Sequence, residues 1–94
     1  MIWTERAEAD LDEIWRFSRR KWGEEQADLY LAKLNADMAD GRRRKLHARA
    51  IDFVSPGWFR MRVVRHIIYF CDMDQQILVM RVLHDSMDET LHLP

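Results

Sequence analysis

The chain has 94 residues, 48% of them hydrophobic, with three glycines and two prolines, which predicts one compact globular domain spanning residues 1–94. Its formal net charge is only −1, but residues 41–71 carry eight basic side chains against one acidic, and the segments on either side are net acidic. With no apolar run of about 20 residues, no basic-then-apolar export signal and a single cysteine, Cys71, we expect a cytoplasmic protein with no internal disulfide and no membrane partner.

Two amphipathic helices are predicted in the first half of the chain. Over residues 4–22, apolar side chains recur every three or four positions, and Thr4 suits an N-cap. A second apolar stripe follows over residues 24–39. Because little more than Gly23 separates them, we expect the helices to fold back as an antiparallel hairpin. Trp15 and Trp22 fall on the first stripe and are expected in the core.

A long polar connection is expected from residue 40 to residue 57. It ends in the turn signal Ser55-Pro56-Gly57 and contains most of the basic block. That block is either a solvated loop or a surface for an acidic partner, and its excess of positive charge favours the partner surface. The residues of this basic patch are Arg42, Arg43, Arg44, Lys45 and Arg49.

Three antiparallel strands are predicted in the second half, over residues 58–64, 67–71 and 77–83, joined at residues 64–65 and 72–75. The first strand alternates, with Phe59, Met61 and Val63 expected on one side. The opposite side would carry Trp58, Arg60 and Arg62.

The phase of the last strand is less determined by its sequence. We expect Leu78, Met80 and Val82 to face inward, with Val79, Arg81 and Leu83 facing outward. Covered on one face by the helical hairpin, these strands form a two-layer α+β domain. A domain this small is expected to leave a sheet edge open, ahead of residue 58 or along residues 77–83, which invites an added strand from a partner.

Several ordered segments carry a family resemblance. They are Thr4-Glu5-Arg6-Ala7-Glu8-Ala9-Asp10-Leu11-Asp12-Glu13-Ile14-Trp15, Trp22-Gly23-Glu24-Glu25-Gln26-Ala27, Arg65-His66-Ile67-Ile68-Tyr69-Phe70, Arg81-Val82-Leu83-His84 and Met87-Asp88. In this order they resemble the ParE/RelE superfamily of toxins from type II toxin–antitoxin modules, and most closely its ParE branch.

The resemblance implies a fold and a function. The fold is a helical hairpin packed on a curved antiparallel sheet, with a short N-terminal strand ahead of the three C-terminal strands. The expected partner is an antitoxin whose C-terminal segment wraps around the toxin, with DNA contacted only through that complex. ParE-branch members typically poison DNA gyrase, whereas RelE-branch members cleave mRNA on the ribosome.

The two activities need different residues. RNA cleavage needs an acid or base near the 2′-hydroxyl and cations that stabilise the transition state. Under the resemblance, the candidates for that alternative are Arg65, Arg81 and His84. A C-terminal tyrosine is missing, and the tail is acidic where RNA cleavage would need positive potential. We therefore favour a gyrase inhibitor that acts by binding rather than as an enzyme, with a non-toxic, antitoxin-binding regulator as a further alternative.

The sheet is expected to supply the surface that binds the target or the antitoxin. The residues of this surface are Trp58, Arg60, Arg62, Arg65, Arg81 and His84. Trp3 and Trp58 are expected to be partly exposed. Two of these assignments have an ordinary structural alternative: His84 bonded to a backbone carbonyl, and Arg81 paired with Asp85 or another acidic side chain.

Metal and cofactor chemistry is not expected. The four histidines lack the spacing of metal ligands, and Cys71 has no cysteine near it in the sequence. A chain with three glycines has no glycine-rich phosphate loop.

Overall fold

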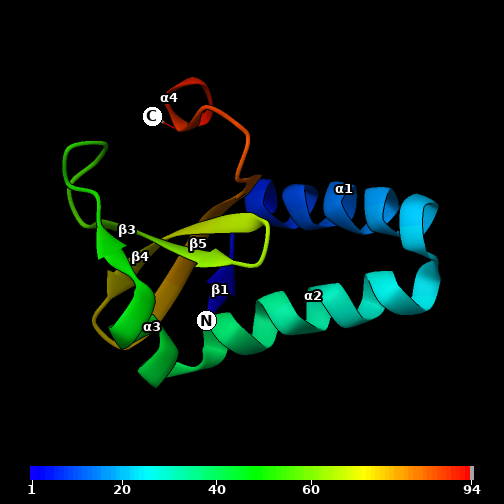
Figure 1. Ribbon diagram of the computed structural model, residues 1–94. Coiled ribbons are helices and arrows are strands. Elements are labelled where there is room, and N and C mark those ends of the chain that lie inside the picture. Colours follow the sequence, from blue (N-terminus) through cyan, green and yellow to red (C-terminus); the bar gives the residue numbers. More distant parts are fainter. Residues whose placement is uncertain (94) are drawn as a thin grey trace.

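The computed structural model describes residues 1–93 and shows a helical hairpin beside a five-stranded sheet (Figure 1). The elements in chain order are β1 (Ile2–Trp3), α1 (Glu5–Trp22), α2 (Glu24–Ala39), α3 (Gly41–His47), β2 (Arg49–Ala50), β3 (Trp58–Val63), β4 (His66–Met73), β5 (Gln76–His84) and α4 (Glu89–His92). The predicted α+β class is confirmed.

The helical hairpin forms where the sequence predicts it. The Thr4 side chain accepts a hydrogen bond from the Ala7 N–H at 3.1 Å and so caps α1. Gly23 alone separates α1 from α2, with a positive φ of 91° that favours glycine. The expectation that Trp22 is in the core is wrong, because this last residue of α1 lies at the hairpin tip, 59% exposed, with its ring edge-on to Phe17.

The sheet has the strand order β1-β5-β4-β3-β2. Strands β2 to β5 pair antiparallel, through turns at Val64-Arg65 and Asp74-Gln75. The short β1 instead pairs parallel with β5, placing Ile2 opposite Leu78. The sheet is therefore mixed rather than wholly antiparallel. The chain passes from β1 directly into α1, and the strand that later pairs with β1 is β5, which runs parallel to it.

The segment between α2 and β3 is more ordered than predicted. The Asp40 carboxylate accepts hydrogen bonds from the backbone N–H groups of Arg42 and Arg43 and so caps α3. Arginine, lysine and leucine are good helix formers, and they continue the helix to His47. The basic run thus lies on a short helix followed by the edge strand β2, not in an extended loop.

Two apolar clusters form on opposite faces of the sheet. The cluster between sheet and hairpin joins α1 and α2 to alternate residues of the strands, among them Met61, Val63 and Val79. A second cluster lies on the face away from the hairpin, here called the outer face. Its buried members are Ile51, Trp58, Ile67, Tyr69 and Leu83. The predicted alternation of β3 is confirmed.

The predicted phase of β5 is wrong over part of the strand. Ile77 and Val79 join Val82 in the cluster under the hairpin, while Met80 packs on the outer-face cluster. A register shift explains this: Tyr69 pairs with Arg81 and the next residue of β4 pairs with Val79, so Met80 is the extra residue of a bulge. Alternation therefore reverses at Met80.

The edge of β5 is also more covered than predicted. Beyond β1, the Thr4 N–H donates to the Val79 carbonyl and the Thr4 hydroxyl to the Met80 carbonyl, both at 3.1 Å. The Asp10 carboxylate then accepts a hydrogen bond from the Val82 N–H at 2.9 Å. The first turns of α1 thus satisfy the edge groups that an added strand would use.

Candidate functional site

The tryptophan predicted on the binding surface is not available to a partner in this conformation. Trp58 is 8% exposed and belongs to the outer-face cluster, where Ile51 and Leu93 also pack. The expectation of partial exposure is wrong because the segment before β3 and the segment after β5 both fold over this face. The segment after β5, residues 85–93, is here called the tail.

The tail supplies the carboxylate that forms an ion pair with Arg60. Glu89 Oε2 lies 3.3 Å from Arg60 Nη1 and accepts a hydrogen bond from the Tyr69 hydroxyl at 2.7 Å. Burial first, and then the bond to Glu89, raise the pKa of Tyr69, which therefore stays a neutral donor. This predicted binding residue is thus already engaged within the chain.

Asp85 engages the three other predicted residues at the end of the sheet. Its carboxylate lies 2.8 Å from Arg62 Nη1, 3.4 Å from Arg65 Nε and 3.2 Å from His84 Nδ1. The hydrogen bond from Arg62 holds the pKa of Asp85 below its ordinary value. His84 Nδ1 also lies 2.7 Å from Ser86 Oγ and accepts a hydrogen bond from the Ser86 backbone N–H at 3.1 Å, so its partners are Asp85 and Ser86 rather than the expected backbone carbonyl.

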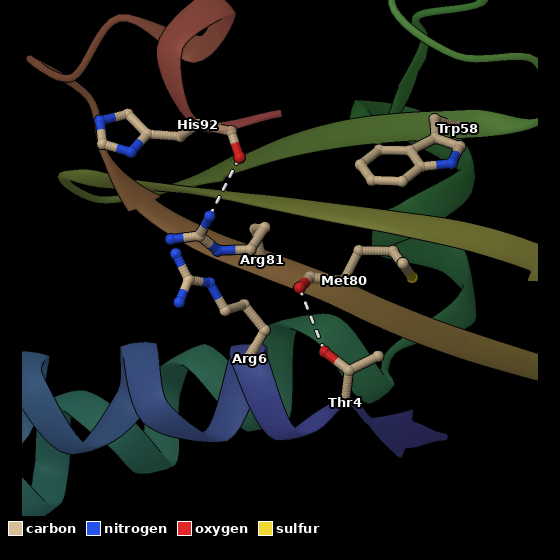
Figure 2. A pocket seen from close by; sticks show the side chains of 6 residues that line it. All are labelled: Thr4, Arg6, Trp58, Met80, Arg81 and His92. Carbon is tan, nitrogen blue, oxygen red and sulfur yellow. Dashed lines mark hydrogen bonds between the residues drawn. The ribbon is translucent and has the colours of Figure 1, made fainter. Parts of the chain in front are cut away.

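Arg81 is held by a carboxylate on α1. Its Nε and Nη2 donate to Asp10 at 2.8 and 3.0 Å, and its Nη1 donates to the His92 carbonyl at 3.0 Å. The bonds to Asp10 raise the pKa of the guanidinium. Arg81 lines a hollow of about 310 Å³. Figure 2 shows its guanidinium beside that of Arg6, with Trp58 on the other side of the hollow. The expected alternative of an acidic partner is confirmed, and that partner is Asp10.

The three candidates for RNA cleavage do not converge on one group. Arg65 and His84 share Asp85, whereas Arg81 contacts Asp10 and His92. Arg65 and Arg81 each already have a carboxylate within 4 Å, which lowers the positive potential that a phosphodiester would meet.

Two residues outside the predicted set complete the end of the sheet. The Tyr30 hydroxyl lies 2.6 Å from His66 Nδ1, and His66 stacks edge-on against its cross-strand neighbour His84. Because the Tyr30 oxygen accepts from the Arg65 N–H, we assign its proton to the bond with His66. The pair joins helix α2 to strand β4 across 36 residues, so no local sequence pattern indicates it.

Four residues of the basic patch lie on α3, whereas Arg49 lies on β2 directly opposite Arg60 and so stands beside the outer-face arginines. Arg43 Nε lies 3.2 Å from the Asp37 carboxylate, and Arg44 donates to the Met38 carbonyl. A hollow of about 230 Å³ opens beside the patch. It is lined by Asp40, Arg42, Arg43, Leu46 and His47.

Removing the Tyr69 hydroxyl tests the contact between tail and sheet. We expect Tyr69→Phe to lower the free energy of unfolding by about 1–2 kcal/mol, because the mostly buried Glu89 carboxylate loses the hydroxyl that donates to it. Urea unfolding measures this change in the free energy of unfolding, and Tyr30→Phe provides a comparison at another hydroxyl that forms hydrogen bonds. A double-mutant cycle with Glu89→Gln that shows no coupling between the two sites would contradict the contact.

The part of the chain that the structure describes has neither a metal-binding cluster nor a membrane-spanning helix. Within residues 1–93, no three histidine, cysteine, aspartate or glutamate side chains gather so as to hold a metal ion. None of the helices described combines the length and the apolar character that crossing a membrane requires.

Comparisons with known proteins agree with one another. A family model described as the ParE toxin of the type II toxin–antitoxin system parDE matches residues 1–89. The protein named Toxin ParE1 of Caulobacter vibrioides is 32% identical over 88 residues, covering 94% of this chain and 91% of that relative. Toxin ParE1 of Mycobacterium tuberculosis H37Rv is 32% identical over 83 residues, covering 87% and 85%. Toxin ParE of Escherichia coli is 35% identical over 89 residues, covering 93% and 85%.

Proposed function

Because the chain belongs to the ParE toxin family of type II toxin–antitoxin systems, we propose that it is a single-domain toxin that inhibits DNA gyrase by binding. A cognate antitoxin neutralises it in the cytoplasm by wrapping its C-terminal segment around the toxin. DNA is contacted only through that complex.

One observation favours binding over cleavage: the three candidate residues for RNA cleavage contact two different carboxylates and do not converge on one site. Arg81 is tied to Asp10 on α1, and Arg65 and His84 are tied to Asp85. Transition-state stabilisation of a phosphodiester needs cations aimed at one site. This arrangement supports a toxin whose surface, rather than a catalytic group, acts on the target.

Two assays run together test the proposal. Purified protein is expected to inhibit gyrase supercoiling and to leave mRNA intact on translating ribosomes, and prior addition of the antitoxin should restore supercoiling. Arg65→Gln with His84→Gln serves as the variant for the alternative activity, because it removes two cleavage candidates. Ribosome-dependent cleavage that this variant abolishes, with gyrase unaffected, would establish the ribonuclease instead.

A growth assay separates the third possibility. Expression without the antitoxin is expected to arrest growth, and co-expression of the antitoxin to rescue it and raise solubility. Normal growth with ample soluble protein would identify a regulator that binds its antitoxin without being toxic.

A further inference from the structure

The chain has two basic surfaces, and only one of them is free. On the outer face, Arg60, Arg62, Arg65 and Arg81 each lie within 4 Å of a carboxylate of the same chain. An anionic partner that docks there must first displace Glu89, Asp85 or Asp10. These four arginines are therefore already paired with carboxylates of the same chain.

The cations of α3 are different. Arg42 and Lys45 are exposed, and neither forms an ion pair with a carboxylate of residues 1–93. The acidic residue nearest to them along the chain, Asp40, accepts hydrogen bonds from the helix backbone. The ion pairs that α3 does make involve its neighbour Arg43, with Asp37.

An apolar side chain stands among these cations. Leu46 is 75% exposed and lines the hollow of about 230 Å³ together with Arg42, Arg43, His47 and Asp40, whose carboxylate accepts hydrogen bonds from the helix backbone. A leucine in this position gains nothing from a sugar–phosphate backbone, whereas it gains from an aliphatic side chain that is buried against it. Free cations around an exposed leucine match a polypeptide that carries acidic and aliphatic residues on one face.

We propose that α3 forms the docking surface for an acidic amphipathic polypeptide segment, with Leu46 as the apolar contact and Arg42 and Lys45 of the same helix as its free cations. The inference rests on the proposed function to the extent that it takes this segment to belong to the antitoxin. It locates that contact on the α3 side of the molecule and not on the arginines of the outer face.

Fluorescence anisotropy with a labelled probe tests the surface. The probe is a synthetic amphipathic peptide of glutamate, leucine and alanine, and a second peptide carries glutamine for every glutamate. The full chain is expected to bind the acidic peptide, and binding should weaken with salt as exposed charges are screened. The double variant Arg42→Gln, Lys45→Gln is expected to bind it about fivefold more weakly.

Matched variants make the result specific. Arg16→Gln with Arg20→Gln removes the same charge from exposed positions on α1, and should leave binding within about twofold. Leu46→Ser should weaken the binding of the acidic peptide without changing how that binding depends on salt. Equal losses in both double variants, no binding of the acidic peptide, or tighter binding of a labelled DNA duplex would overturn the proposal. Gyrase inhibition is measured without these peptides, so the two proposals fail separately.

Discussion

Replacing Asp10 with alanine is expected to lower the free energy of unfolding by about 3–4 kcal/mol. The Asp10 and Arg81 side chains are each 12% exposed and joined by two hydrogen bonds. The substitution leaves a guanidinium that is mostly removed from water without its counter-charge. It also removes the acceptor of the Val82 N–H on a residue that is 3% exposed. A domain is typically stable by about 5–15 kcal/mol, so this single change is large.

Chemical denaturation measures the effect, with Asp12→Ala as the matched control. Asp12 is exposed on the same helix, and its carboxylate accepts no side-chain hydrogen bond from residues 1–93, so its loss should change stability by less than about 0.5 kcal/mol. Adding Arg81→Met to Asp10→Ala should recover part of the loss, because the unpaired charge disappears. A loss below about 1 kcal/mol in Asp10→Ala would show that the pair is not a structural link.

The elements that the sequence predicts best are those set by neighbours along the chain. The N-cap at Thr4, the helical stripe of α1 and the alternation of β3 all depend on residues a few positions apart. The phase of β5 depends on how the strand pairs with β4, and the bulge at Met80 reverses it. The link between Asp10 and Arg81 joins residues 71 positions apart, and nothing local marks it.

For the charged residues too, the sequence predicts local features but not the contacts between distant segments. The sequence correctly identifies the arginines of β3 and β5 and the acidic tail as two separate features. It does not show that the tail folds back, so that Asp85 and Glu89 meet those arginines. The helix α3 is missed because seven residues are too few for a clear period, although Asp40 followed by strong helix formers is a usable signal.

Acidification is expected to lower stability through His66. Burial, and to a lesser extent the nearby His84, lower its pKa from an ordinary value near 6.5 to about 4, while Asp85 opposes the shift. The ring faces Tyr30 from α2, Arg65 from the preceding turn, and His84 and Asp85 from the end of β5. Among these, the neutral ring is the acceptor of the Tyr30 hydroxyl.

The sign follows from proton linkage. Below pH 6.5 the unfolded chain binds a proton at His66, whereas the folded chain keeps this ring neutral until about pH 4. The stabilising contribution is therefore complete above pH 6.5 and is lost as the pH falls through this window. Between pH 7 and about 4.5 the loss attributable to His66 is about 2 kcal/mol.

The comparison of His66→Gln with the wild type isolates this contribution, because the carboxylates titrate in both proteins. Glutamine retains an acceptor for the Tyr30 hydroxyl but has no proton to gain, so the variant should lose about 2 kcal/mol less than the wild type over the same pH range. His47→Gln, an exposed position on α3, should titrate like the wild type. Parallel pH profiles for all three proteins would mean that His66 is not held neutral in the fold, and that the contact with Tyr30 forms equally well with a charged ring.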